Sequence, residues 1–129
     1  MAMQNPYQSY KQNCVTTVTP EELVVLVYKG LEKYLRQGII FVEQNDVEKA
    51  NNAILKAQDI INELMSSLDM NIDMSQQLYS LYDFMRSNLI QANVRKDPNK
   101  IREVLDIAAG LRESWEKALL QVRQLKYGK

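Results

Sequence analysis

Four stretches of the chain repeat apolar residues every three or four positions, and short polar breaks separate them. This spacing puts the apolar side chains on one face of an α-helix, which turns about 100° per residue. Breaks of about two to six residues leave no length for a crossover, so consecutive helices must run antiparallel. The pattern therefore predicts an all-α fold, an antiparallel up-down-up-down four-helix bundle.

The first helix has a strong start signal at Thr19-Pro20-Glu21-Glu22. Thr19 offers a capping hydroxyl, Pro20 suits the first helical position, and Glu22 can reach back to the amide of Thr19. The apolar pattern continues until Gln44-Asn45-Asp46, so we predict a helix over residues 20–43.

Polar caps also mark the other three helices. We predict the second helix from Asp46 to Ser67 or Leu68, the third over residues 74–94 with Asp73 or Ser75 as its cap, and the fourth from Pro98 to residue 126 with Asp97 as its cap. Apolar residues at steps of three and four form the predicted seam of each helix. These seams are Ala50, Ile54, Ala57, Ile61, Leu64 and Leu68 on the second helix; Met74, Leu78, Leu81, Tyr82, Met85, Leu89 and Ala92 on the third; and Ile101, Val104, Leu105, Ala108, Leu111, Trp115, Leu119 and Val122 on the fourth.

Residues 1–18 differ from the rest of the chain. They are mostly polar, contain Pro6, and lack sustained helical periodicity, although Tyr7 and Tyr10 stand among them. A chain of 129 residues leaves little room for a second domain. We therefore expect one helical-bundle domain over residues 1–129, with a mobile arm at 1–18 and the bundle at 19–126.

The charged residues argue against most chemistry. The chain has 16 basic and 16 acidic residues and no histidine. A balanced charge offers phosphates no clustered excess of Lys and Arg, so we expect no nucleic-acid partner. Without histidine the chain lacks the commonest general base and the commonest metal ligand, and no glycine-rich phosphate loop appears. We expect no enzyme activity, no metal site and no cofactor.

The single cysteine, Cys14, cannot form a disulfide within the chain, and a free thiol suits a reducing compartment. The first 14 residues lack the apolar core of a signal peptide, and no apolar run approaches the ~20 residues that span a bilayer. We expect a cytoplasmic protein without membrane insertion.

The first predicted helix carries more apolar residues than one seam needs, because they cover a sector about 200° wide. One stripe, interpreted as the seam, contains Leu23, Leu26, Val27, Gly30, Tyr34 and Phe41. The second stripe contains Val24, Tyr28, Leu31, Leu35, Ile39 and Val42.

Two interpretations of the extra apolar residues remain open. The stripes can meet two neighbouring helices, as a bundle requires, or they can leave an exposed groove for an apolar partner segment. The arm tyrosines are likewise either incidental or docked reversibly on that surface. The candidate partner-binding residues are Tyr7, Tyr10, Tyr28, Leu31, Leu35, Leu55, Tyr79, Tyr82, Phe84 and Ile90.

Two packing expectations follow from the fourth helix and the glycines. Trp115 continues the apolar seam of the fourth helix and should be substantially buried. Gly30, Gly38 and Gly110 lie inside predicted helices, where glycine is unfavourable, and should permit close helix approach.

Several motifs, whose order and spacing together are specific, make the chain resemble the FliS family of flagellar secretion chaperones. They begin with Asn5-Pro6-Tyr7, Tyr10, Thr17-Val18-Thr19-Pro20-Glu21-Glu22-Leu23 and Val27-Tyr28-Lys29-Gly30. They continue with Lys56-Ala57-Gln58-Asp59-Ile60-Ile61-Asn62-Glu63-Leu64, Leu81-Tyr82-Asp83-Phe84-Met85, Ala92-Asn93 and Leu111-Arg112-Glu113-Ser114-Trp115. Mild departures from the family pattern occur at Val18, Val27 and Gly38.

The resemblance implies an antiparallel bundle that binds the C-terminal segment of flagellin, without catalysis. It also implies that the arm, with Tyr7 and Tyr10 at the matching positions, lies over part of the binding surface and moves when flagellin arrives. Covering the flagellin segment would block premature polymerisation and keep it competent for type III export. The alternative is a helical scaffold or regulator whose extra apolar face forms a weak homodimer.

Overall fold

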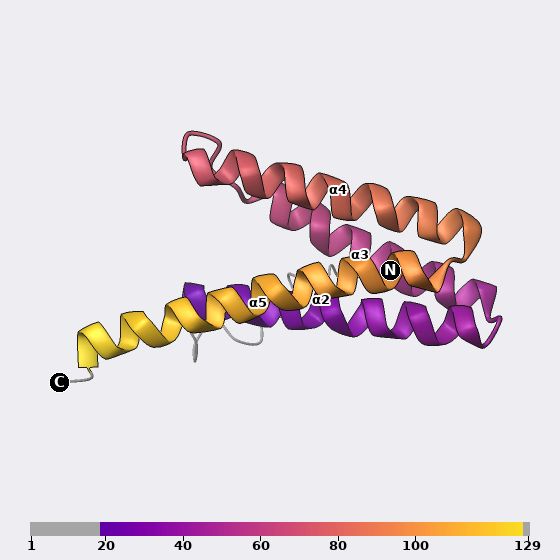
Figure 1. The fold of residues 1–129 in the computed structure, drawn as a ribbon, viewed down its shortest axis with the longest axis horizontal. Helices are drawn as coiled ribbons and strands as arrows, with labels where there is room; N and C mark the ends of the chain where they lie inside the picture. The colour runs from indigo at the N-terminus through magenta and orange to yellow at the C-terminus, as the bar shows by residue number, and fades with distance from the viewer. Residues whose placement is uncertain (1–18, 128–129) are drawn as a thin grey trace, which may run out of the picture.

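The computed structural model describes residues 19–127, and Figure 1 shows them as four helices. The helices are α2 (Pro20–Glu43), α3 (Val47–Ser66), α4 (Asp73–Arg95) and α5 (Pro98–Tyr127). These bounds confirm the predicted helices to within one or two residues. Tyr7, Tyr10, Cys14 and the rest of the predicted arm lie outside the described residues.

The four helices form a closed ring of neighbours. Each helix packs against the next one in the chain, and α5 packs against α2 as well. Within residues 19–127 the backbones of the diagonal pairs, α2 with α4 and α3 with α5, stay apart, although the side chains of Tyr28 on α2 and Tyr82 on α4 meet across the core. This arrangement confirms the up-down-up-down bundle. No helix of this part of the chain is both long enough and apolar enough to cross a membrane.

Three of the four predicted caps are confirmed. Thr19 and Glu22 form the reciprocal capping box, with N···O distances of 3.0 and 3.1 Å. The Asp46 carboxylate accepts from the Lys49 amide at 3.1 Å, and Asp97 accepts from the Asn99 amide at 2.9 Å.

The cap of α4 was predicted wrongly. Ile72 occupies the N-cap position without a side-chain hydrogen bond, and Asp73 is already the first helical residue. The turn before it is held instead by Asp69, whose carboxylate accepts from the Asn71 amide at 3.1 Å. Asp69 therefore organises the turn rather than the helix end.

The seam predicted for the first helix needs correction. Four residues of the second stripe, Tyr28, Leu31, Leu35 and Ile39, are buried in the core. Of the predicted seam, Val27 and Gly30 are buried, whereas Leu23, Leu26, Tyr34 and Phe41 are only partly buried. The reason is that α2 packs against both α3 and α5, so its buried face is wide enough to include residues of both stripes. On α3 the predicted seam is confirmed by the burial of Ala50, Ile54, Ala57, Ile61 and Leu64.

The two ends of the bundle differ. At the closed end, the α2–α3 and α4–α5 turns lie together; at the open end, the start of α4 diverges from the last turns of α5 (Figure 1). At the open end two residues that were predicted to be buried in the seams, Met74 and Val122, are exposed. Trp115 packs against the core but is only partly buried, because α4 has already turned away from α5.

The glycines also behave differently from one another. A methyl group added at Gly38 would meet Ile54 Cγ1 at 3.4 Å and Ile101 Cδ1 at 3.6 Å, which agrees with a close helix approach. At Gly110 nothing lies within 4 Å of that position among the described residues, so the expected close approach is wrong there.

A buried ion pair ties α2 to α5. Glu32 is 2% exposed, and its carboxylate accepts from Arg112 Nε at 2.5 Å, while Arg36 lies 3.3 Å away on the outer side. The hydrogen bond with Glu32 raises the pKa of Arg112. The pair satisfies a carboxylate that would otherwise be costly to bury.

Candidate partner-binding surface

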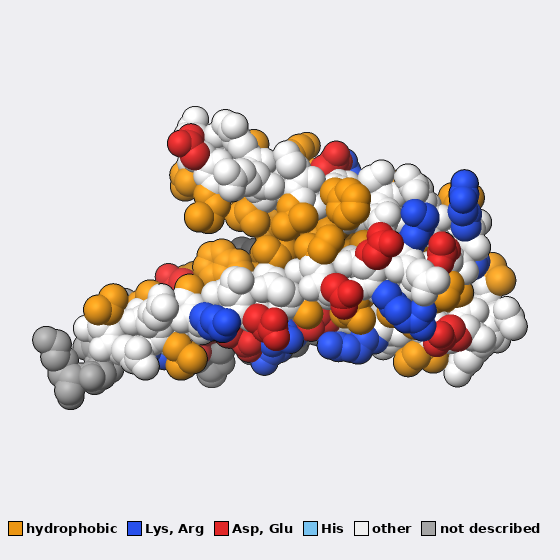
Figure 2. Space-filling view, viewed as in Figure 1, with side chains coloured by type: hydrophobic (Ala, Val, Ile, Leu, Met, Phe, Trp, Pro, Cys, Tyr) orange, Lys and Arg blue, Asp and Glu red, His pale blue; other side chains and the backbone are white. Residues whose placement is uncertain are grey.

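Three hollows of the described surface are lined by large apolar side chains. They are the α3–α4 groove, the open cleft above the core at the open end, and the α2–α5 groove. Figure 2 shows hydrophobic side chains gathered in the hollow between the start of α4 and α5, where the open cleft lies.

The α3–α4 groove, of about 360 Å³, brings two predicted residues together. Leu55 of α3 and Ile90 of α4 are both more than two-fifths exposed and line the same groove, with Val94 beside them. Exposed large apolar side chains that adjoin one another are typical of protein interaction sites.

The rim of the α3–α4 groove is polar and well ordered by hydrogen bonds. Asn93 donates to the Asn51 side chain at 2.7 Å, and Lys96 Nζ donates to the Asn93 side chain at 2.6 Å. Lys96 adopts the left-handed conformation, with φ of 51°, at the C-cap of α4. Its ammonium group thus stands at the negative end of a helix and beside the apolar groove.

The open cleft, of about 190 Å³, receives residues from all four helices. Its apolar walls are Val24, Val27, Leu64, Leu68, Leu78 and Trp115. Tyr28 and Tyr82 also line it, and their hydroxyl oxygens are 2.5 Å apart. Burial raises the pKa of both tyrosines, so both hydroxyls keep their protons at neutral pH.

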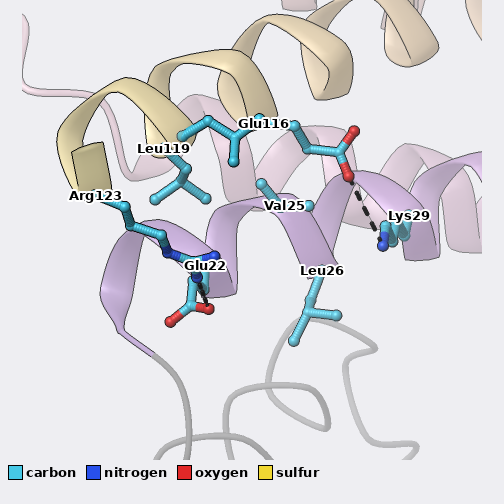
Figure 3. A pocket seen from close by; sticks show the side chains of 8 residues that line it. Glu22, Val25, Leu26, Lys29, Glu116, Leu119 and Arg123 are labelled. Carbon is cyan, nitrogen blue, oxygen red and sulfur yellow. Dashed lines mark hydrogen bonds and ion pairs between the residues drawn. The ribbon is translucent and has the colours of Figure 1, made fainter. Parts of the chain in front are cut away.

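The α2–α5 groove is the largest, about 510 Å³, and it was not predicted. Its floor consists of Val25 and Leu26 of α2 and Leu119 and Leu120 of α5. In Figure 3 the side chains of Val25 and Leu119 lie between two ion pairs, one at each end of the groove. One feature of the sequence could have indicated this groove. Leu119 belongs to the predicted seam of the fourth helix, and Leu120 is an additional apolar residue outside that seam.

The ion pairs of the α2–α5 groove join its two helices. Arg123 pairs with Glu22 at the start of α2, and Lys29 Nζ lies 3.9 Å from Glu116 (Figure 3). The hydrogen bond from the Thr19 amide, together with Arg123, holds the pKa of Glu22 below its usual value. Both pairs are partly exposed and contribute little to stability.

The ten predicted site residues separate into three groups. Leu55, Tyr79, Phe84 and Ile90 are exposed, but only Leu55 and Ile90 share a hollow. Tyr28, Leu31, Leu35 and Tyr82 are at most 2% exposed, so we correct their assignment from open surface to core, although Tyr28 and Tyr82 still form the floor of the open cleft. Tyr7 and Tyr10 are outside the described residues.

Comparison with known proteins agrees with the fold and with the motifs. A solved structure described as a flagellar chaperone from bacteria has the same fold, with a TM-score of 0.75 and 20% identity over 89% of this chain and 95% of that one. The family model for flagellar protein FliS matches residues 3–122.

Full-length relatives share the same name. The flagellar secretion chaperone FliS of Bacillus subtilis is 38% identical over 99% of this chain and 96% of its own length. The protein of that name from Salmonella typhimurium is 32% identical over 81% of this chain and 80% of its own length. These matches span the bundle and are too extensive to come from shared helical periodicity alone. The chain therefore belongs to the FliS family of flagellar secretion chaperones.

Proposed function

We propose that this chain is a cytoplasmic export chaperone that binds the C-terminal segment of flagellin. By covering that segment it prevents premature polymerisation and keeps flagellin competent for flagellar type III secretion. Family membership carries the proposal, and the exposed apolar lining of the α3–α4 groove supports it. The chaperone acts by binding and not by catalysis.

The apolar hollows suit a partner that arrives unfolded. Ordering a disordered segment costs several kcal/mol, so the segment must bury extended apolar contacts to remain bound. Grooves on three sides of the bundle, each bordered by polar or charged side chains, provide such contacts along a wrapping path. Leu55, Ile90, Tyr79 and Phe84 are the exposed residues that we assign to this path.

The test is size-exclusion chromatography with the C-terminal segment of the flagellin from the same genome. We expect the chain and the segment to elute together, and we expect Leu55→Asp with Ile90→Asp to abolish co-elution by placing charge in the α3–α4 groove. Glu48→Lys is the matched control, because it also changes charge on exposed α3, away from the lining of that groove. Separate elution of wild-type chain and segment would contradict the proposal.

The same measurement separates a second candidate, the homodimeric scaffold. Leu120, Val122 and Leu125 are exposed near the end of α5, and such an unpartnered apolar stretch favours self-association. Under the scaffold hypothesis the chain elutes as a dimer whether or not the segment is present. Under the chaperone hypothesis the segment changes the elution position.

We further propose that Tyr7 and Tyr10, in an arm of residues 1–18, cover apolar surface of the bundle in the free chain and that flagellin displaces them. The family resemblance and the two aromatic residues in a polar segment motivate this model. Hydrogen exchange should then differ between the free and bound chain at residues 5–12. Identical exchange in the two states would refute displacement and leave the chaperone proposal standing.

A further inference from the structure

The floor of the open cleft contains one more hydrogen-bond donor than the described residues can use. A tyrosine hydroxyl has one proton to donate. Tyr28 and Tyr82 therefore have two protons between them, and their mutual hydrogen bond at 2.5 Å uses one. Among the described residues neither hydroxyl has a further acceptor, and the Trp115 indole cannot serve because its N–H only donates.

This spare donor is buried yet reaches the cleft. The two tyrosines are 1% and 2% exposed, and both line the cavity. A buried donor without an acceptor is costly, so natural proteins provide one from the protein, from water or from a ligand. Because burial raises the pKa of both hydroxyls, neither loses its proton at neutral pH, and the donor persists.

The size and lining of the cleft limit what can bring the acceptor. A volume of about 190 Å³ is below the ~300 Å³ at which small-molecule pockets begin, yet a dry apolar cavity of about 150 Å³ holds a benzene. None of the described residues that line the cleft is charged, so a charged group would lose its hydration there without a counter-ion from them. The cleft has room for one apolar side chain of a bound peptide. The backbone carbonyl next to that side chain would supply the hydrogen-bond acceptor.

We propose that the open cleft is a peptide subsite in which the spare hydroxyl proton of the Tyr28–Tyr82 pair donates to a backbone carbonyl of the bound flagellin segment, while a neighbouring aliphatic or aromatic side chain of that segment fills the cavity. This inference rests on the proposed function, because it takes flagellin as the source of the segment. It adds a specificity rule: the residue that enters the cleft is uncharged and apolar.

The pair can supply its donor from either hydroxyl, and this makes the test selective. In Tyr28→Phe or Tyr82→Phe the mutual bond is lost, but the remaining hydroxyl keeps a proton that it can now give to the peptide. Only the double substitution removes the donor while keeping both rings. The free energy of unfolding should therefore fall already in each single variant, whereas peptide affinity should fall only in the double variant.

The experiment is a fluorescence-anisotropy titration of the labelled flagellin C-terminal segment with the full chain, and urea unfolding of each variant runs in parallel. We expect each single variant to bind within about twofold of wild type and the double variant to bind about 3- to 10-fold more weakly, as the loss of one neutral hydrogen bond predicts. Tyr34→Phe, which removes a hydroxyl from α2 outside the cleft lining, is the matched control and should bind as wild type does.

Three results would overturn the inference. Double-variant binding within twofold of wild type would show that no peptide acceptor uses the donor. Affinity losses that follow the stability losses variant by variant would show a purely structural pair. Failure of wild type to bind would overturn both this inference and the proposed function, whereas the first two results leave that function intact.

A second measurement uses the single tryptophan of the chain, Trp115, which lines the cleft. When a segment that lacks tryptophan binds, an apolar side chain next to the partly buried indole should shift its emission to shorter wavelength. Unchanged emission at saturating peptide would place the segment elsewhere and refute the cleft as its subsite.

Discussion

The closed and open ends of the bundle use the same kind of sequence pattern with different results. At the closed end Leu35, Leu89 and Ile101 are at most 1% exposed, and Gly38 lets α2 approach α3 and α5 closely. At the open end Met74, Val122 and Leu125 continue the apolar pattern, but none of the helices within residues 19–127 covers them. The comparison teaches that apolar periodicity marks a face that needs a partner, but that partner need not be another helix of the same chain.

The largest loss of stability should come from removing a buried side chain at the closed end. Leu89→Ala removes a fully buried side chain, so the free energy of unfolding should fall by about 3 kcal/mol through lost transfer and the cavity left behind. Met74→Ala, on the same helix at the open end, is the matched control and should change it by less than about 0.5 kcal/mol. Urea unfolding measures both, and equal losses would remove the distinction between the two ends.

The next effect concerns the ion pair between α2 and α5. Arg112→Met leaves the Glu32 carboxylate buried with Arg36, at 3.3 Å, as its one remaining ion-pair partner among the described residues, and the free energy of unfolding should fall by about 2 kcal/mol. The loss stays below that of a fully isolated buried charge because Arg36 remains.

Arg102→Met is the matched control for that substitution. It breaks the exposed pair with Glu43, whose N···O distance is also 2.5 Å, and should cost less than about 1 kcal/mol. If the two arginine variants lose the same stability, burial does not decide the strength of these pairs.

The sequence predicted the helix bounds well because their signals are local. Thr19-Pro20-Glu21-Glu22, Asp46 and Asp97-Pro98 each cap a helix through contacts within three residues, and no distant part of the chain is needed. Ile72 escaped this reasoning, because it occupies the cap position without any side-chain bond.

The candidate partner-binding surface was less predictable, since it depends on how the helices pack against each other. Leu55 and Ile90 were each recognised as surplus apolar residues, but their meeting in one groove requires the register of α3 against α4. On α2 the apolar sector is so wide that periodicity could not choose the inward stripe, so Tyr28 was assigned to the surface and proved to be core. The divergence of α4 from α5 cannot be predicted from the apolar spacing of either helix, because it depends on how the two helices pack together.

Alkaline pH should probe the boundary between the two ends, where Tyr28 and Tyr82 lie. The unfolded chain releases tyrosine protons near pH 10.0, but burial raises the pKa of both residues in the folded chain. Above that pH the unfolded state binds fewer protons than the folded state, so stability falls as pH rises. Each group contributes up to about 1.4 kcal/mol per pH unit.

The double variant Tyr28→Phe/Tyr82→Phe isolates this contribution. Its unfolding free energy at neutral pH should be lower than that of wild type, but its further loss between pH 10 and 11 should be about 1 to 2 kcal/mol smaller. Unfolding in urea at each pH provides the comparison. Parallel losses for the two proteins would mean that the cleft floor is open enough for the tyrosines to ionise freely.

The smallest effects should come from filling two glycines, and their difference measures how tightly the closed end is packed. Gly110→Ala should raise unfolding free energy by about 1 kcal/mol, because alanine is the better helix former and the new methyl group meets no described atom within 4 Å. Gly38→Ala gains the same helical preference, but its methyl group must fit 3.4 Å from Ile54 and 3.6 Å from Ile101. These are ordinary contact distances, so we expect a smaller gain of about 0.5 kcal/mol as the neighbours adjust. Thermal unfolding of the two variants gives the comparison directly. A lower free energy of unfolding for Gly38→Ala would mean that the closed end is packed too tightly to accept one methyl group. A lower value for Gly110→Ala would mean that this face of α5 is covered in solution.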